Sequence, residues 1–278
     1  MKTPITYYGG KQNMLKYILP MIPDHKQYVE PFLGGAAVFF AKPKSAHEVV
    51  NDLDGRITNF FRVCQSKDFY KLKELIDMSP NSEITYLKSK DIMKGVVKPV
   101  DDIEFAWAFW AQTTMTFSSQ IGGGFAFANN DIAAKKTMNK RINFTDHFMR
   151  RLQNVEIFQR DAVDLIKMKD GVDTWFYIDP PYVSSAQSHY SGYTTEHFIR
   201  LLDTLANIKG KFLLSCYPET CLDQYADCHW HRKEIVQKTS VANVRVSDKN
   251  TNTVRKEKTE CLIWNYEIGR SQHPIFNE

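Results

Sequence analysis

The chain of 278 residues has an ordinary share of hydrophobic and charged residues, so we expect a globular protein with a substantial core. Its formal net charge of +4 permits an anionic partner without requiring one. No charged and then apolar leader follows Met1 and no apolar run is long enough to span a bilayer, which predicts a soluble intracellular protein without membrane contact.

The five cysteines form an odd set without paired spacing, and reduced thiols are the simplest interpretation. Cys221, Cys228, His229 and His231 lie close together in the sequence, but their spacing fits no common zinc pattern. We therefore expect no metal.

The first motif is Tyr7-Tyr8-Gly9-Gly10-Lys11, followed by a helical pattern that stops at Pro20. Glycines that let the backbone approach a ligand, beside a lysine and a helix start, are typical of an anion site. A flexible, solvated turn is the alternative.

Residues 27–30 are predicted to form a strand, and residues 31–37 a glycine turn that leads into an apolar helix. Strand, glycine turn and helix make the first unit of a nucleotide-binding sheet, but the Gly-x-Gly-x-x-Gly pattern of dinucleotide sites is missing. A second strand at 48–50 ends at Asp52, where an acidic residue would hold ribose hydroxyls. The alternative is that Asp52 or Asp54 caps the helix predicted over 57–64.

From about residue 66 to 151 the pattern changes to helices and a polar loop, which we interpret as an insertion between strands of one sheet. A short amphipathic helix is predicted over 71–76, and an aromatic, core-forming helix over 103–115. The loop after it contains Ser119 and Gln120, and basic residues including Lys140 and Arg141 follow. Phosphate contacts are one interpretation of these charges and a solvated helix face is the other.

The sheet pattern resumes at 155–158, ending at Asp161, and at 174–178, ending at Asp179-Pro180-Pro181-Tyr182. Three acidic residues at successive strand ends predict one ligand-binding rim. Asp179 and the Pro180 carbonyl could accept both N–H groups of an exocyclic amine, while Tyr182 stacks on the flat ring that bears it. An acidic turn that merely closes the strand is the alternative.

A polar loop with Tyr193 follows, then a helix capped by Thr194 or Thr195, and a buried strand at 211–216. Residues 241–258 look like a basic hairpin or loop containing Arg245 and Lys249. A last strand is predicted over 260–266.

In this order the motifs resemble the Dam-type (D12 class) adenine-N6 DNA methyltransferases, which use S-adenosylmethionine. The resemblance covers nearly the whole chain. It implies an α/β fold, with a Rossmann-like methyltransferase sheet formed by residues 1–64 and 152–278. It also implies a mainly helical target-recognition domain inserted at 65–151.

The resemblance also assigns roles to residues. The catalytic residues would be Asp179, Pro180, Pro181 and Tyr182. The cofactor would be held by Tyr7, Gly9, Gly10, Lys11, Glu30, Phe32, Gly34, Asp52, Asp161 and Asp179. DNA contacts are expected from Ser119, Gln120, Lys140, Arg141, Tyr193, Arg245 and Lys249.

The implied activity is site-specific DNA adenine-N6 methylation, EC 2.1.1.72, on an adenine flipped out of double-stranded DNA. A monomer or weak dimer in the cytoplasm of a bacterial or phage-infected cell is expected, and a cognate restriction endonuclease is a partner that the resemblance allows. Residues 112–117 lack the asparagine and arginine of Dam relatives, so recognition of GATC is not inferred.

Three other functions compete with this hypothesis. An RNA adenine-N6 or DNA cytosine-N4 methyltransferase could use the same clamp. A nicotinamide-dependent oxidoreductase is disfavoured by the missing dinucleotide pattern. A DNA-binding protein with a vestigial cofactor site is disfavoured by the intact acidic rim.

Overall fold

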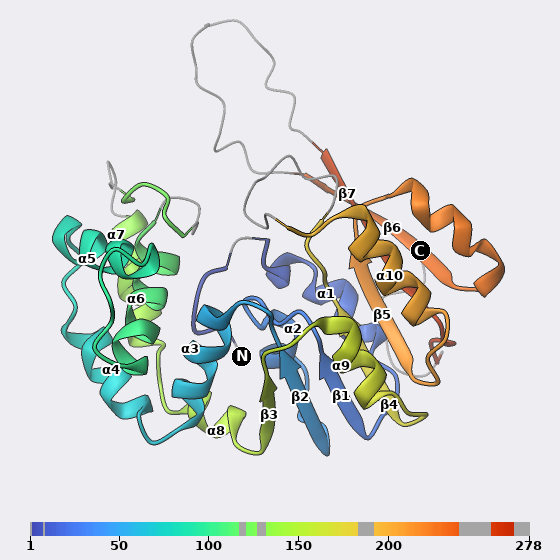
Figure 1. Ribbon diagram of the computed structural model, residues 1–278, viewed down its shortest axis with the longest axis horizontal. Coiled ribbons are helices and arrows are strands. Elements are labelled where there is room, and N and C mark those ends of the chain that lie inside the picture. The colour runs from blue at the N-terminus through green and yellow to red at the C-terminus, as the bar shows by residue number, and fades with distance from the viewer. Residues whose placement is uncertain are drawn as a thin grey trace, which may run out of the picture.

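The computed structural model describes residues 2–7, 9–116, 121–126, 132–182, 192–238 and 257–269 (Figure 1). The strands are β1 (Gln27–Glu30), β2 (His47–Asn51), β3 (Val155–Phe158), β4 (Thr174–Ile178), β5 (Lys211–Cys216), β6 (His231–Lys238) and β7 (Glu257–Trp264). The α-helices are α1 (Leu15–Ile18), α2 (Ala37–Ala41), α3 (Gly55–Gln65), α4 (Phe69–Met78), α5 (Glu83–Met93), α6 (Asp102–Met115), α7 (Ile132–Ile142), α8 (His147–Leu152), α9 (Ala162–Lys169) and α10 (Thr195–Leu205). Short 3-10 segments are η1 (Lys11–Asn13), η2 (Leu19–Met21) and η5 (Thr220–Cys228).

The seven strands form one sheet in the order β3-β2-β1-β4-β5-β7-β6. The five strands from β3 to β5 are parallel, and β7 runs antiparallel between β5 and β6. The chain moves outward from β1 to β3 and then returns to β4, so the strand order reverses between β1 and β4. Open α/β sheets bind ligands beyond the carboxyl ends of the strands at this reversal.

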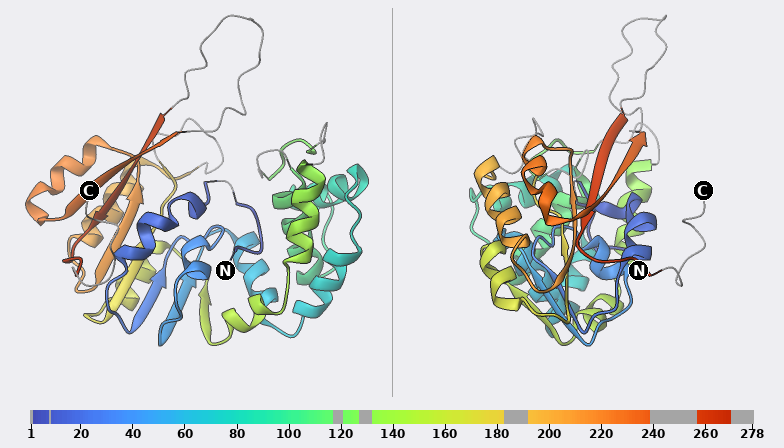
Figure 2. Two further views of the ribbon diagram at one scale, coloured as in Figure 1. Left: turned by 180° about the vertical axis from the view of Figure 1, so that it is seen from behind. Right: turned by 90° about the vertical axis from the view of Figure 1, so that its right-hand side faces the viewer.

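Both faces of the sheet are buried, as parallel sheets require. Alternate residues of one strand enter different cores, so Tyr28 packs with α1, α2 and α3 while Val29 packs with α9 and α10. Figure 2 shows the N-terminal helices on the face opposite α9 and α10. The predicted α/β fold with a Rossmann-like sheet is therefore confirmed.

The helices α4 to α7 stand together beyond β3, in the chain between β2 and β3 (Figure 1). Helix α6 forms because its apolar residues can be buried on nearly every side, with Phe109 and Trp110 fully enclosed. Phe60 of α3 lies 5.8 Å from Phe109 and 6.2 Å from Phe144, ring centre to ring centre. One hydrophobic core therefore runs from the sheet into the helical segment.

Side-chain caps fix where the helices begin. Asp54 accepts a hydrogen bond from the Arg56 amide at the start of α3, and Thr194 accepts one from the His197 amide at the start of α10. Asp161 caps α9 in the same way, accepting from Val163 at 2.9 Å. Of the alternatives left open by the sequence, Asp54 and Thr194 supply the caps.

The sequence analysis did not predict α5, α8, α9 or β6, and it left a helix at the position of α7 as one of two interpretations. The predicted last strand is shifted, because it pairs with β6 from Glu257 and ends at Trp264. No helix among the described residues is long and apolar enough to cross a membrane. The five cysteines are free, and no cluster of metal-binding side chains occurs within the described ranges.

Candidate active site at the carboxyl edge of the sheet

Asp179 stands directly after β4, at the point where the strand order reverses. All five residues of β4 are buried, and the following Pro180 and Pro181 end the strand because neither can donate a ladder hydrogen bond. The carboxylate is therefore presented at the carboxyl edge by a rigid strand. Burial raises the pKa of Asp179 above its ordinary value, and the ammonium group of Lys11 opposes that rise.

Lys11, from the glycine motif near the N-terminus, is brought to this carboxylate by η1. Its Nζ lies 2.9 Å from Asp179 Oδ1, although the side chain is only 7% exposed. Burial lowers the pKa of Lys11, but Asp179 and Glu260 outweigh that effect and leave the pKa raised. Lys11 is thus a buried, charged partner of the candidate catalytic aspartate.

Tyr182 completes this group, since its hydroxyl accepts a hydrogen bond from Lys11 and lies 3.2 Å from Asp179 Oδ1. The Lys11 ammonium also lies 4.7 Å from the centre of the Tyr182 ring. On the other side, the ring of Tyr217 lies 4.1 Å from that of Tyr182, tilted by 45°. Tyr217 and Glu260 were not predicted as site residues, because neither belongs to a motif that the sequence analysis recognised.

Asp52 and Glu30 stand at the ends of β2 and β1, beside Asp179. Asp52 accepts hydrogen bonds from the amides of Gly34, at 2.9 Å, and Asp54, at 3.0 Å. Burial raises the pKa of Asp52 to about 6. Glu30 accepts a hydrogen bond from Tyr28 at 2.6 Å, and burial raises its pKa to about 8.

The glycine turn after β1 allows a close backbone approach. Gly34 has φ of +47°, a left-handed conformation that favours glycine. A Cβ atom on Gly35 would lie 2.7 Å from Cβ of Tyr7, so only glycine fits there without movement. Tyr7 of the N-terminal motif therefore lies in contact with the glycine turn after β1.

Asp161, Phe32 and Tyr193 form the outer end of the rim. Asp161 Oδ2 pairs with Arg200 at 3.1 Å, while its other oxygen caps α9. The ring of Phe32 meets that of Tyr193 edge to face, with centres 6.1 Å apart. The Tyr193 hydroxyl is buried without a hydrogen-bond partner among the described residues, and burial raises its pKa.

These residues fit an adenosine-bearing cofactor without a pyrophosphate. A buried carboxylate, an aromatic pair and an unpartnered hydroxyl suit ribose hydroxyls and an adenine ring better than a phosphate, which carboxylates would repel. Tyr193, expected to contact DNA, thus lies against Phe32 at the outer end of the rim.

The other residues expected to contact DNA divide into two groups. Lys140 donates to the backbone carbonyls of Thr3 and Ile5 at 2.7 and 2.9 Å, and Arg141 donates to the carbonyl of Ser79. Both charged groups therefore tie α7 to neighbouring backbone. Ser119, Gln120, Arg245 and Lys249 lie outside the described residues.

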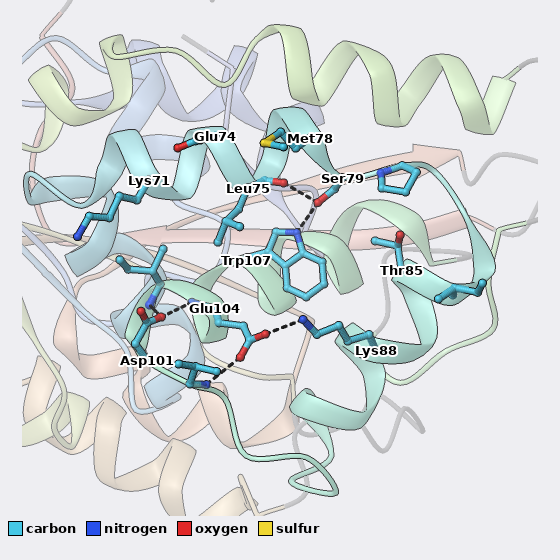
Figure 3. Close-up of a pocket in the computed structure, with 14 residues that line it drawn as sticks. Lys71, Glu74, Leu75, Met78, Ser79, Thr85, Lys88, Asp101, Glu104 and Trp107 are labelled. Atoms are coloured by element: carbon cyan, nitrogen blue, oxygen red, sulfur yellow. Dashed lines mark hydrogen bonds and ion pairs between the residues drawn. The ribbon is translucent and has the colours of Figure 1, made fainter.

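A separate surface groove of about 600 Å³ lies between α4, α5 and α6. Figure 3 shows Trp107 at its centre, where the indole N–H donates to Ser79 at 2.6 Å and Lys88 pairs with Glu104 at 2.7 Å. None of the residues assigned to the cofactor or to catalysis lines this groove. It is therefore distinct from the strand-end site.

Residues 7–239, which include the N-terminal glycine motif and the strand ends at Asp52, Asp161 and Asp179, match the family model for the D12 class of N6 adenine-specific DNA methyltransferases. The chain belongs to this family. The type II methyltransferase M1.LlaDCHI of Lactococcus lactis subsp. cremoris is 25% identical over 93% of this chain and 93% of its own. The type II methyltransferase M.CviBI of Paramecium bursaria Chlorella virus NC1A is 24% identical over 77% of this chain and 82% of its own.

Another relative is much longer than this chain. The type II methyltransferase M.FokI of Planomicrobium okeanokoites is 22% identical over 96% of this chain but only 43% of its own length. A family that is specific for adenine in DNA does not favour the RNA and cytosine-N4 alternatives. The protein is therefore a DNA adenine-N6 methyltransferase.

Proposed function

We propose that this methyltransferase transfers a methyl group from S-adenosylmethionine to N6 of an adenine flipped out of a specific duplex DNA site, the activity of EC 2.1.1.72. The observation that carries the proposal is the position of Asp179, fixed at the end of β4 against the buried Lys11. A carboxylate so placed can accept a hydrogen bond from an amine presented at the switch point of the sheet.

The rim residues support binding of the cofactor. Asp52 would accept the ribose hydroxyls and Asp161 the adenine amine. Glu30, Phe32 and Gly34 would contact the cofactor, which Tyr7, Gly9, Gly10 and Lys11 would help enclose. When bound, S-adenosylmethionine supplies a methyl group on a positively charged sulfur. Buried carboxylates near that charge, such as Glu30, favour its binding.

For the transfer to occur, the N6 amine must be correctly oriented, and this matters more than a strong base that removes its proton. The N6 lone pair of adenine is delocalised into the ring, so hydrogen bonds to Asp179 and to the Pro180 carbonyl would turn that lone pair toward the methyl group. Pro181 keeps the turn rigid. Positioning of this kind can supply much of the acceleration of a direct displacement.

The target base must leave the DNA stack before it can reach Asp179. Extrusion costs a few kcal/mol. Stacking on the ring of Tyr182 would offset about 1–3 kcal/mol. Ser119, Gln120, Arg245 and Lys249 remain our candidates for contacts to the duplex, while Lys140 and Arg141 would first have to leave their carbonyl partners.

The biological setting is proposed from the relatives. Type II methyltransferases among them suggest modification of one recognition sequence, and a cognate restriction endonuclease as a genetic partner. A monomer or weak dimer acting in the cytoplasm suffices for this reaction, and no residue assigned above requires a metal.

The direct test is methyl transfer from tritiated S-adenosylmethionine to plasmid DNA by purified wild type and Asp179→Ala. We expect loss of at least a thousandfold in rate for the variant, with cofactor and DNA affinities within about fivefold of wild type, because orientation terms of this size are typical of reacting groups. Asp173→Asn, at an exposed ion pair, is the matched control and should keep full activity. Substantial transfer by Asp179→Ala would refute the assigned role.

A further inference from the structure

Glu260 is a buried carboxylate at the start of the buried half of strand β7. It lies in β7, and the next three residues, Cys261, Leu262 and Ile263, are all buried. Its own side chain is 11% exposed. A charge in such a strand is costly unless it is paired and hydrogen-bonded, so its partners indicate its role.

Those partners belong to the candidate active site. Glu260 Oε1 accepts hydrogen bonds from Ser215 at 2.6 Å and from the Tyr182 hydroxyl at 2.5 Å, and Lys11 Nζ lies 3.1 Å away. A tyrosine hydroxyl has one hydrogen to donate. Because Tyr182 is closer to Glu260 than to Asp179, that hydrogen goes to Glu260.

Lys11 forms ion pairs with two carboxylates, with Nζ 2.9 Å from Asp179 and 3.1 Å from Glu260. Both contacts of Lys11 and Tyr182 with Asp179 use Oδ1. As far as the described residues extend, Oδ2 is left for another donor. Glu260 thus shares both Lys11 and the Tyr182 hydroxyl with Asp179.

We propose that Glu260 is a positioning residue for methyl transfer, which holds Lys11 and Tyr182 so that Asp179 keeps one oxygen for the target amine. It acts through these two side chains and does not touch the reacting atoms. The proposal rests on the proposed function, since it takes Asp179 as the residue that binds N6.

The test is the single-turnover rate of methyl transfer at saturating cofactor and DNA, on a duplex that carries the site modified by the wild type. Glu260→Gln keeps the shape and the hydrogen-bond acceptor but removes the charge. We expect its rate to fall at least tenfold, while dissociation constants for cofactor and DNA change less than about threefold. Glu234→Gln, the same change at an exposed position on the neighbouring strand β6, should leave the rate unchanged.

A double-mutant cycle with Lys11→Met distinguishes positioning from general structure. If Glu260 acts through Lys11, adding Glu260→Gln to Lys11→Met should lower the rate by less than threefold further, because residues that share one contact are not additive. Full additivity would overturn the proposal. A wild-type rate for Glu260→Gln, or a loss matched by falling thermal stability and cofactor binding, would also overturn it.

The two proposals fail in different ways. If wild type transfers no methyl group to DNA, or Asp179→Ala retains activity, the proposed function fails. If Asp179→Ala is inactive and Glu260→Gln is fully active, only the role of Glu260 fails.

Discussion

Glu30 and Asp52 are buried carboxyl groups that we propose lie beside the cofactor, and their raised pKa values make a pH prediction. In the ligand-free protein these pKa values are about 8 and about 6. Both lie above the ordinary values, so the folded protein holds these protons more tightly than the unfolded chain, and stability falls as pH rises through this range. These two groups are therefore expected to make the ligand-free protein more stable to unfolding at pH 6 than at pH 8.

Cofactor affinity should show the opposite dependence on pH. In the proposed complex an ionised Asp52 accepts two ribose hydroxyls, and an ionised Glu30 attracts the positive charge on the cofactor. We expect the dissociation constant for the cofactor to be at least about tenfold larger at pH 6 than at pH 8. The reason is that the ionised fraction of a carboxyl group falls about tenfold for each pH unit below its pKa. Calorimetry at several pH values measures this, and Glu30→Gln should flatten the upper part of the profile. An affinity that is constant or improves toward pH 6 would contradict the assignment.

Residues at this edge differ in how far the sequence could predict them. Asp52, Asp161 and Asp179 were predictable because each follows a parallel strand, and the carboxyl ends of such strands meet at one edge. Glu260 was not, because it lies in the middle of an antiparallel strand and its partner Lys11 is at the other end of the chain. Such a contact has no local signal in the sequence.

At the scale of elements, Arg151 of α8 joins the end of the helical segment to β2. It pairs with Glu48, with Nη2 2.9 Å from Oε1, and Lys42 pairs with the same carboxylate at 2.5 Å. Burial disfavours the charge on Glu48, but Arg151 and Lys42 outweigh that effect and lower its pKa. This buried cluster fixes the helical segment against the sheet at the edge opposite the candidate site.

We expect Glu48→Gln to lower the free energy of unfolding by about 3 kcal/mol or more, because it leaves two buried cations without a charged partner. Asp173→Asn is the matched control. Its ion pair with Lys26 is exposed, and its removal should cost under about 1 kcal/mol. Urea unfolding at pH 7 compares them, and equal effects would contradict the importance of the buried cluster.

Helices and strands with a clear pattern of apolar residues could be predicted from the sequence. Those with mostly exposed, charged residues could not. The apolar runs that became β4 and α6 gave clear signals. Strand β6 did not, because its edge position leaves Arg232, Lys233 and Glu234 exposed and buries little besides Ile235. Sheet pairing with β7, rather than the local sequence, makes this segment a strand.

At the scale of the whole molecule, one hydrophobic core joins the sheet to the helical segment, so the two parts are not packed as separate domains. The boundaries at 65 and 151 are connections in the chain, while Phe60, Phe109 and Phe144 pack across them. Sheet and helical segment should therefore stabilise each other. This coupling would also hold the helical segment, which we propose recognises DNA, at a fixed distance from the strand-end site.

Phe60→Ala tests this coupling. Removing a fully buried phenylalanine should cost about 3–5 kcal/mol. We expect one calorimetric transition in both wild type and variant, with the variant's shifted to lower temperature. Two separate transitions, with only the helical part destabilised, would show that the segment folds on its own.

The central claim concerns the reaction itself, and sequencing tests it most directly. Single-molecule sequencing of genomic DNA from cells that express the protein, beside cells expressing Asp179→Ala, would record N6-methyladenine in every sequence context. We predict one modified motif with the wild type and none with the variant. Unmodified DNA from well-expressed, folded wild type, or the same motif in both samples, would contradict the account.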